Sequence, residues 1–165
     1  GPVGPQGIQG PQGVAGTPGL TGATGAPSTS AYINYYNTLP QTLNLTDQMT
    51  FLTLTSVGGS SGFSYQNSIA TASVAGTYLV SYEVQASSNR DETVYIGVLQ
   101  SGNIIHRLKV NSTGTQQLWV GSTIVSVNVN DTFQLYAACG SGENTTFTTN
   151  DYGGGGTLNI VRLSD

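Results

Sequence analysis

The stretch GPVGPQGIQGPQGVAGTPGLTGATGAP, residues 1–27, places glycine at every third position without a break. Only glycine fits the crowded axis of three polyproline II strands wound around one another, so this period predicts a collagen triple helix. Five of the chain's six prolines lie in it and pre-set the required backbone. A flexible Gly/Pro-rich linker would need no period. We therefore expect a trimer, or pairing with two related chains.

The composition changes after this repeat. Residues 28–30 read as a short linker, and residues 31–165 have the length of one ordinary domain. Charged residues make up 7% of the chain, against about 25% in an average soluble domain. Four basic residues are too few for a nucleic-acid surface, and no apolar stretch approaches the roughly 20 residues of a membrane span.

The single cysteine and the start of the chain bear on its origin. Cys139 lies in an apolar run, which predicts a buried, inert thiol. Secreted eukaryotic domains more often carry paired cysteines, so their absence favours a bacterial or viral source. The chain opens directly on the triplets, and we expect an N-terminal region before residue 1 that would bind an anchoring protein.

Apolar and polar residues alternate along most of the remaining chain. This period of two indicates half-buried strands, no amphipathic helix is visible, and glycine, asparagine and serine separate the runs, including a turn expected at 57–60. Many short strands with regular turns predict a β-sandwich or jelly roll. The expected strands are 31–37, 49–55, 68–74, 77–86, 93–100, 104–110, 117–128, 132–139, 144–149 and 157–163.

Three segments resemble the heads of the complement C1q and tumour necrosis factor family. They are SVAGTYLVSY at 73–82, VYIGVLQSGN at 94–103 and VSVNVNDTFQL at 125–135, and the chain ends on a strand as that family does. The resemblance implies an all-β, ten-stranded jelly-roll head whose three copies pack around a threefold axis as a homotrimer.

Within that family the chain is similar to bacterial collagen-like proteins of the BclA type, which form the nap of the Bacillus spore exosporium. SIATASVAGTY at 68–78 and AYINYYN at 31–37 carry this likeness. It implies an extracellular structural filament on a spore or cell surface, with the head trimerising and capping the stalk. Phage fibres share the plan, and the stalk here is short. The alternative is therefore the receptor-binding tip of a phage or adhesive fibre that recognises a glycan or surface protein.

Aromatic side chains are the natural filling for a threefold axis, although each could equally belong to the core of a single chain. The candidates for the axis are Tyr35, Tyr36, Tyr78, Tyr82, Trp119, Phe133 and Tyr136.

No catalytic site is expected. His106 is the one histidine and has no legible nucleophile or acid beside it, and no hydrolase, zinc-protease or phosphate-loop motif occurs. We therefore predict neither an enzyme nor a cofactor. Calcium remains an alternative, because a threefold axis could gather copies of one carboxylate. Its candidate ligands are Asp91, Glu92, Asp131, Glu143 and Asp151.

Recognition of a ligand is expected to fall to the loops at 87–92, 111–116 and 143–155. The alternative for the first of these is a solvated hairpin. The candidate contact residues are Arg90, Asp91, Glu92, Asn111, Thr113, Phe147 and Tyr152.

Overall fold

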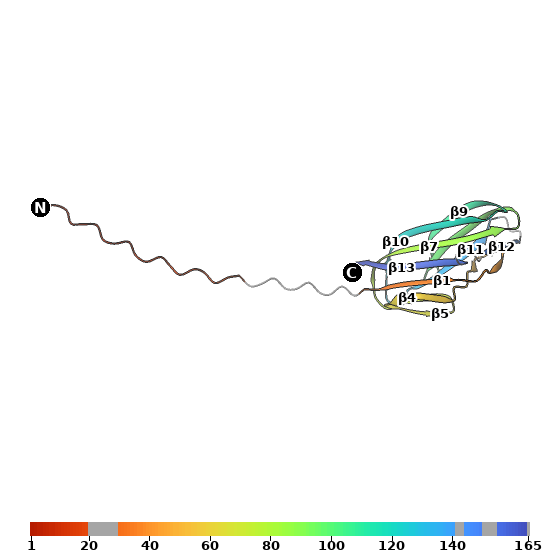
Figure 1. Cartoon of the computed structure of the whole chain (residues 1–165), viewed down its shortest axis with the longest axis horizontal. Helices are drawn as coiled ribbons and strands as arrows, with labels where there is room; N and C mark the ends of the chain where they lie inside the picture. Colours follow the sequence, from red (N-terminus) through yellow and green to blue (C-terminus); the bar gives the residue numbers. More distant parts are fainter. Residues whose placement is uncertain (20–29, 141–143, 150–154, 165) are drawn as a thin grey trace.

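The computed structural model describes residues 1–19, 30–140, 144–149 and 155–164. Residues 1–19 form an extended segment without helix or strand, and every one of them is exposed (Figure 1). From residue 30 onward the described chain folds into strands alone, arranged as two antiparallel sheets. The all-β jelly-roll sandwich predicted from the sequence is confirmed.

Sheet A contains seven strands, of which β7 is the central one. In spatial order they are β2 (Thr42–Leu45), β12 (Thr145–Thr149), β7 (Gly76–Ser88), β13 (Gly156–Ser164), β1 (Tyr32–Asn37) and β4 (Ser56–Ser61), with β10 (Gln117–Val127) paired to the other edge of β7. Sheet B contains six strands. They are β5 (Phe63–Gln66), β6 (Ile69–Ala72), β11 (Thr132–Cys139), β8 (Asp91–Gln100) and β9 (Asn103–Thr113), with β3 (Thr50–Phe51) paired to β11.

The core lies between the two sheets and is built by alternation. Tyr78, Val80 and Tyr82 on β7 are 2% exposed or less, while the residues between them are half-buried. Phe133 and Leu135 on β11 close the core from sheet B. Side chains at every second position of a strand share one face, so the period of two in the sequence translates directly into the two sides of each sheet.

The head has two distinct ends. At the end that we call proximal, β1 begins at Tyr32 and β13 ends at Ser164; at the opposite, distal end β7 ends at Ser88 and β8 begins at Asp91. The proximal β8–β9 hairpin turns through Ser101 and Gly102, which have φ angles of 48° and 82°. Two consecutive positive φ angles match the right-handed twist of the flanking strands, as a tight two-residue hairpin turn requires.

The strand count is higher than predicted. The described residues form thirteen strands rather than ten; β2, β4 and β5 were missed, and the expected strand at 49–55 shrinks to β3. The turn expected at 57–60 is wrong, because these residues belong to β4 and pair with β1. A Cβ at Gly58 would collide with the Asn34 side chain, so glycine here permits close pairing rather than a turn.

Asp131 braces the proximal end. Its carboxylate accepts hydrogen bonds from the Asn128 backbone N–H (2.8 Å), the Gln100 side-chain amide (2.7 Å) and the Ser101 hydroxyl (2.8 Å). Desolvation alone would raise the pKa of Asp131, but these hydrogen bonds outweigh it and hold the pKa below its usual value of 3.8. One carboxylate thus ties the β10–β11 turn to the β8–β9 hairpin.

We expect Asp131→Asn to lower the free energy of unfolding by about 1 kcal/mol, and the melting temperature by about 2–5 °C, because water partly replaces the lost bonds at this surface turn. A carboxyl with a depressed folded-state pKa stabilises above its unfolded pKa, and this contribution disappears as the pH falls through the folded pKa. Thermal melts between pH 7 and pH 2 should show the two proteins converging in acid. Asp47→Asn, at an exposed position, is the matched control and should melt like the parent; equal loss in both variants would contradict the brace.

Candidate binding pocket at the distal end

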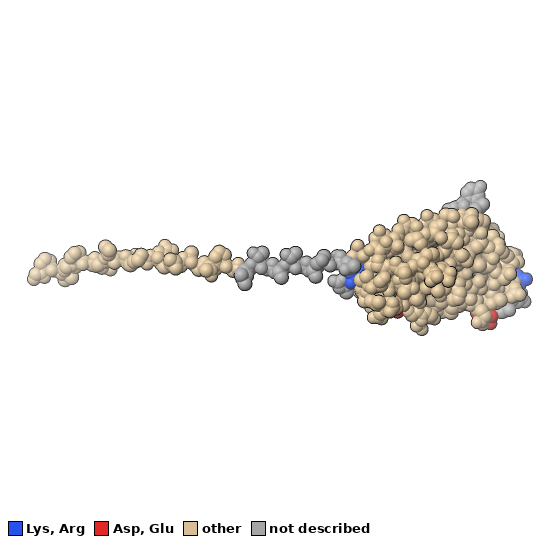
Figure 2. Space-filling model, turned by 90° about the horizontal axis from the view of Figure 1, so that it is seen from below, with Lys and Arg blue, Asp and Glu red and all other residues tan. Residues whose placement is uncertain are grey.

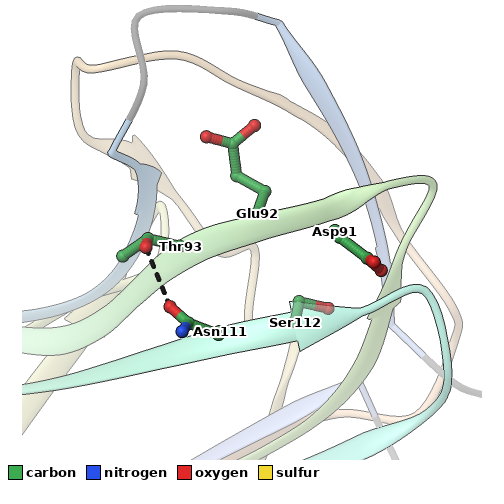
Figure 3. A pocket seen from close by; sticks show the side chains of 5 residues that line it. All are labelled: Asp91, Glu92, Thr93, Asn111 and Ser112. Atoms are coloured by element: carbon green, nitrogen blue, oxygen red, sulfur yellow. Dashed lines mark hydrogen bonds between the residues drawn. The ribbon is translucent and has the colours of Figure 1, made fainter.

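A pocket of about 360 Å³ opens at the distal end of the head (Figure 3). It lies where β8 begins and β9 ends, so the two strands that line it are direct neighbours in sheet B. Its volume is within the range of about 300–1,000 Å³ typical of small-molecule sites. The lining residues are Asp91, Glu92, Thr93, Asn111 and Ser112.

Hydroxyl groups hold the hairpin that precedes the pocket. The Ser88 hydroxyl donates to the Arg90 carbonyl oxygen at 2.7 Å and lies 2.6 Å from the Ser112 hydroxyl. The Asn89 side-chain oxygen accepts from the Thr146 backbone N–H at 3.0 Å, which fastens the hairpin to β12. Ser88 and Ser112 are 4% and 1% exposed, so this end of the sandwich has a polar interior beneath the pocket.

Glu92 connects the two sheets at this point. Its half-buried carboxylate accepts a hydrogen bond from the Thr145 hydroxyl at 2.8 Å, and Thr145 on β12 is fully buried. A hydrogen bond to a charged group is worth more than one between neutral groups. Figure 3 shows the Asp91 and Glu92 side chains leaving β8 on different sides, as alternation along a strand demands.

Asp91 and Asn111 supply the pocket's unengaged polar groups. The Asn111 side-chain oxygen accepts from the Thr93 hydroxyl at 2.9 Å, which leaves its NH₂ group free of hydrogen bonds among the described residues. The exposed Asp91 carboxylate likewise has no hydrogen bond or ion pair in the part of the chain that the structure describes. The five described lining residues include two carboxylates and no cation, so this part of the pocket is electronegative.

The structure brings three of the predicted recognition residues together, because Asp91, Glu92 and Asn111 all line this pocket. Arg90 is exposed in the adjoining turn, Thr113 ends β9, and Tyr152 lies outside the described residues. Phe147 does not belong to a recognition surface: it is fully buried and packs on Trp119 with ring centroids 5.6 Å apart.

Ser112 lies within the expected recognition loop at 111–116, although the structure places it on strand β9. Thr93 was not predicted, because it follows the expected loop at 87–92 and lies inside β8. The one sequence signal of Thr93 is a hydroxyl residue beside a predicted loop, which is commonplace in a chain so rich in serine and threonine.

Of the aromatic residues proposed for a threefold axis, only Tyr36 keeps substantial exposed surface. The other six have at most 2% of their surface exposed within the single chain, the alternative that the sequence left open, so they have no area to offer to an axis. These six are Tyr35, Tyr78, Tyr82, Trp119, Phe133 and Tyr136. Five of them belong to the core between the sheets, and Tyr136 packs against Gly97 of β8.

His106 contacts the hydroxyl group of the buried Tyr82. Its Nδ1 atom lies 2.9 Å from the Tyr82 hydroxyl, which in turn lies 3.2 Å from the Ile96 carbonyl oxygen. Burial, and secondarily the neighbouring Tyr136, raise the pKa of Tyr82 to about 12, against an opposing backbone hydrogen bond from Leu108. Tyr82 therefore remains a neutral hydroxyl at physiological pH and joins the two sheets.

The three calcium candidates that the structure describes are not gathered into one site within a single chain. Asp91 and Glu92 lie at the distal end, Asp131 is engaged at the proximal end, and Glu143 and Asp151 fall outside the described residues. No group of three or more acidic, histidine or cysteine side chains suited to a metal occurs among the described residues.

The two-sheet architecture belongs to the class of tumour necrosis factor-like jelly rolls. The chain is similar to the crystal structure of murine APRIL at pH 5.0, with a TM-score of 0.62 and 12% sequence identity over 81% of this chain and 99% of that one. It is also similar to the Eiger TNF structure from S. frugiperda, with a TM-score of 0.57 and 9% identity over 84% and 95% of the two chains.

No protein-family model matches the chain, and no curated protein matches it in sequence. At 9–12% identity the structural likeness establishes the fold and leaves the function to the arrangement of this chain's own residues.

Thr145→Val tests the link between the sheets at the pocket. It removes the hydroxyl with little change of volume, so the Glu92 carboxylate loses one donor; we expect a loss of about 1–2 kcal/mol in denaturant unfolding. Thr148→Val on the same strand is the control, since Thr148 makes only an exposed 3.4 Å contact with Thr42. Similar destabilisation by both substitutions would show that the Thr145 bond is not special.

Proposed function

We propose that this chain is the distal part of a trimeric, extracellular, collagen-stalked surface filament, in which the head trimerises and caps the stalk. Its role is structural rather than enzymatic. The observation that carries the proposal is an uncovered apolar row on the outer face of sheet A.

This row crosses four adjacent strands near the proximal end. Strand register aligns Ile124 with Leu79, Leu79 with Val161, and Val161 with Tyr32. Ile124, Val161 and Tyr32 are 62%, 45% and 44% exposed, which is unusual for large apolar side chains placed side by side. Contact with a second copy would remove this surface from water.

Strand β10 is a long edge strand, whose free edge needs protection from pairing with other chains. It runs for eleven residues and, among the described strands, is hydrogen-bonded to β7 alone; its outward positions Leu118 and Val120 are 56% and 60% exposed. A long apolar edge strand left open is a site for uncontrolled pairing. Packing of this edge against neighbouring copies in a closed trimer would protect it.

A polar row lies beside the apolar one. Ser122, Ser81, Asn159 and Asn34 are aligned across β10, β7, β13 and β1, and the Asn34 amide donates a hydrogen bond to the Asn159 side-chain oxygen. Polar groups within an apolar contact set the register of associating chains more than they add to affinity. On the outer face of sheet A, the apolar row would thus drive association with other copies, and the polar row would align them.

Residues 1–19 support three chains rather than one. Val3, Ile8 and Val14 are 99–100% exposed, and a Cβ added at any glycine of this segment would meet nothing within 4 Å. A single polyproline II strand leaves its glycine edge open, and two further strands fill that space in a triple helix. A stalk of three chains is compatible with a head that associates with its copies through the outer face of sheet A.

On this proposal the filament projects from a spore or cell surface, as in an exosporium nap, and an anchoring protein holds a region before residue 1. No helix among the described residues is long and apolar enough to cross a membrane. Figure 2 shows a side of the head on which charged groups appear only near the two ends, a neutral surface suited to a crowded outer layer.

A second function, the ligand-binding tip of a phage or adhesive fibre, is favoured by one observation, the distal pocket. It lies at the end of the head opposite to the start of β1, where a projecting fibre meets its surroundings. Both functions use the same trimer, and they differ in what the tip contacts.

Ile124→Asp tests the trimer. A carboxylate placed in the proposed contact would be buried without a partner in all three copies, which costs several kcal/mol each, so the full chain should sediment as a monomer while the parent sediments as a trimer. Met49→Asp is the control, because Met49 is 42% exposed and precedes β3 of the other sheet. A trimeric Ile124→Asp protein would remove sheet A's outer face from the proposal.

Gly13→Val tests the stalk separately. A bulky side chain does not fit at the triple-helix axis, so the collagen circular-dichroism signal and its melting temperature should fall while the chain still sediments as a trimer. Val14→Ala, at a position with 99% exposure, is the control and should preserve the signal. Loss of the trimer in Gly13→Val would show that the stalk, and not the head, is the assembly unit.

A further inference from the structure

We propose that the distal pocket binds a neutral carbohydrate, with Asp91 accepting from one sugar hydroxyl and Asn111 donating to another. This inference rests on the ligand-binding role suggested for the tip and names its ligand class. Every group that it uses comes from a single chain.

The pocket presents the hydrogen-bonding complement of a sugar ring. A hydroxyl group donates one hydrogen bond and accepts others, so a pair of neighbouring hydroxyls is best met by a carboxylate beside an amide NH₂ group. The Asp91 carboxylate has no partner among the described residues, and the Asn111 oxygen is occupied by Thr93 at 2.9 Å, which leaves the amide NH₂ group as a donor.

The spacing suits one ring. Asp91 is paired with Thr113, and Thr93 with Asn111, so Asp91 and Asn111 are diagonal neighbours on adjacent strands. Such neighbours are about 7–8 Å apart, a span that one pyranose with its hydroxyls can bridge. The volume of about 360 Å³ also accommodates a single sugar with some water.

The floor of the pocket is held rigid from below. Ser112, 1% exposed, is linked to Ser88, which is bound to the Arg90 carbonyl oxygen, and Glu92 is bound to Thr145. Buried, satisfied polar networks fix side-chain positions, and fixed positions reduce the entropy lost when a ligand binds.

Charge decides between kinds of sugar. The Asp91 carboxylate that the sugar would contact is negative, and no cation is among the described lining residues, so a sugar acid would be repelled while a neutral pyranose would not. A bound calcium ion is a poor alternative explanation, because it needs about 6–8 oxygen ligands and the Asp91 and Glu92 side chains leave β8 on different sides (Figure 3).

The experiment uses the full chain with methyl glycosides of glucose, galactose, mannose and N-acetylglucosamine, followed by saturation-transfer NMR and calorimetry. At least one should bind with a dissociation constant on the order of 1 mM, as expected for so small a ligand. Methyl glucuronide should bind at least about fivefold more weakly.

Asp91→Asn and Asn111→Ala should each weaken binding about fivefold or more, and both positions are exposed, so the fold should persist in a thermal melt. Asp47→Asn, with the same change of charge at an exposed site outside the pocket, should bind like the parent. A printed array of neutral glycans then distinguishes a glycan terminus from a free monosaccharide as the source of the ring.

Several results would overturn the assignment. They are the absence of binding by all four glycosides, equal binding by the glucuronide, equal effects of Asp91→Asn and Asp47→Asn, loss of binding in EDTA, or binding of oligolysine in place of the sugars. Sedimentation of the same samples keeps this test separate from the trimer. A monomeric chain would still present the whole pocket, so failure to trimerise and failure to bind sugar are distinguishable.

Discussion

Strand β7 is the constraint on which the rest of the head depends. Its thirteen residues are hydrogen-bonded along both edges, to β10 on one side and to β13 and β12 on the other. Its inward side chains, from Tyr78 to Ala86, form the centre of the core, and its outward Leu79 belongs to the exposed apolar row. Its last residue, Ser88, braces the hairpin of the distal pocket. One strand therefore fixes the positions of the core, the proposed association face and the pocket relative to one another.

Alternation along this strand explains what the sequence could reveal. The period of two predicted β7, β10 and β11 to within two residues, because each buries one face in the core. The same period did not identify β4, whose glycines and serines present no apolar face and whose position depends on close pairing with Asn34. Local sequence carries the information for strands that bury side chains, and edge strands without them are specified by their neighbours.

The aromatic residues and the pocket also depend on contacts that the local sequence does not reveal. Tyr78 and Tyr82 share the parity of Val80 and Val84, which places all four on one face, but parity does not say whether that face meets the other sheet or another copy. The structure resolves this in favour of the core. The pocket joins the ends of two strands, and its lining residue Thr93 becomes recognisable only when the register places it beside Asn111.

The two outer faces of the sandwich also differ in charge, and this difference bears on assembly. The outward residues Leu79, Ser81 and Val161 at the centre of sheet A are uncharged, with Glu83 the nearest carboxylate towards the distal end. On sheet B, β9 carries two exposed cations, Arg107 and Lys109, and the Arg107 guanidinium lies 4.7 Å from the centre of the Tyr95 ring.

Burying a charge without a partner is costly, whereas a cation over an aromatic ring at the surface keeps its water. A chain that places its few charges in this way leaves sheet A free to face its copies and keeps sheet B towards solvent. The scarcity of charge is therefore most marked at the centre of the outer face of sheet A. The exposed apolar row lies on the same face.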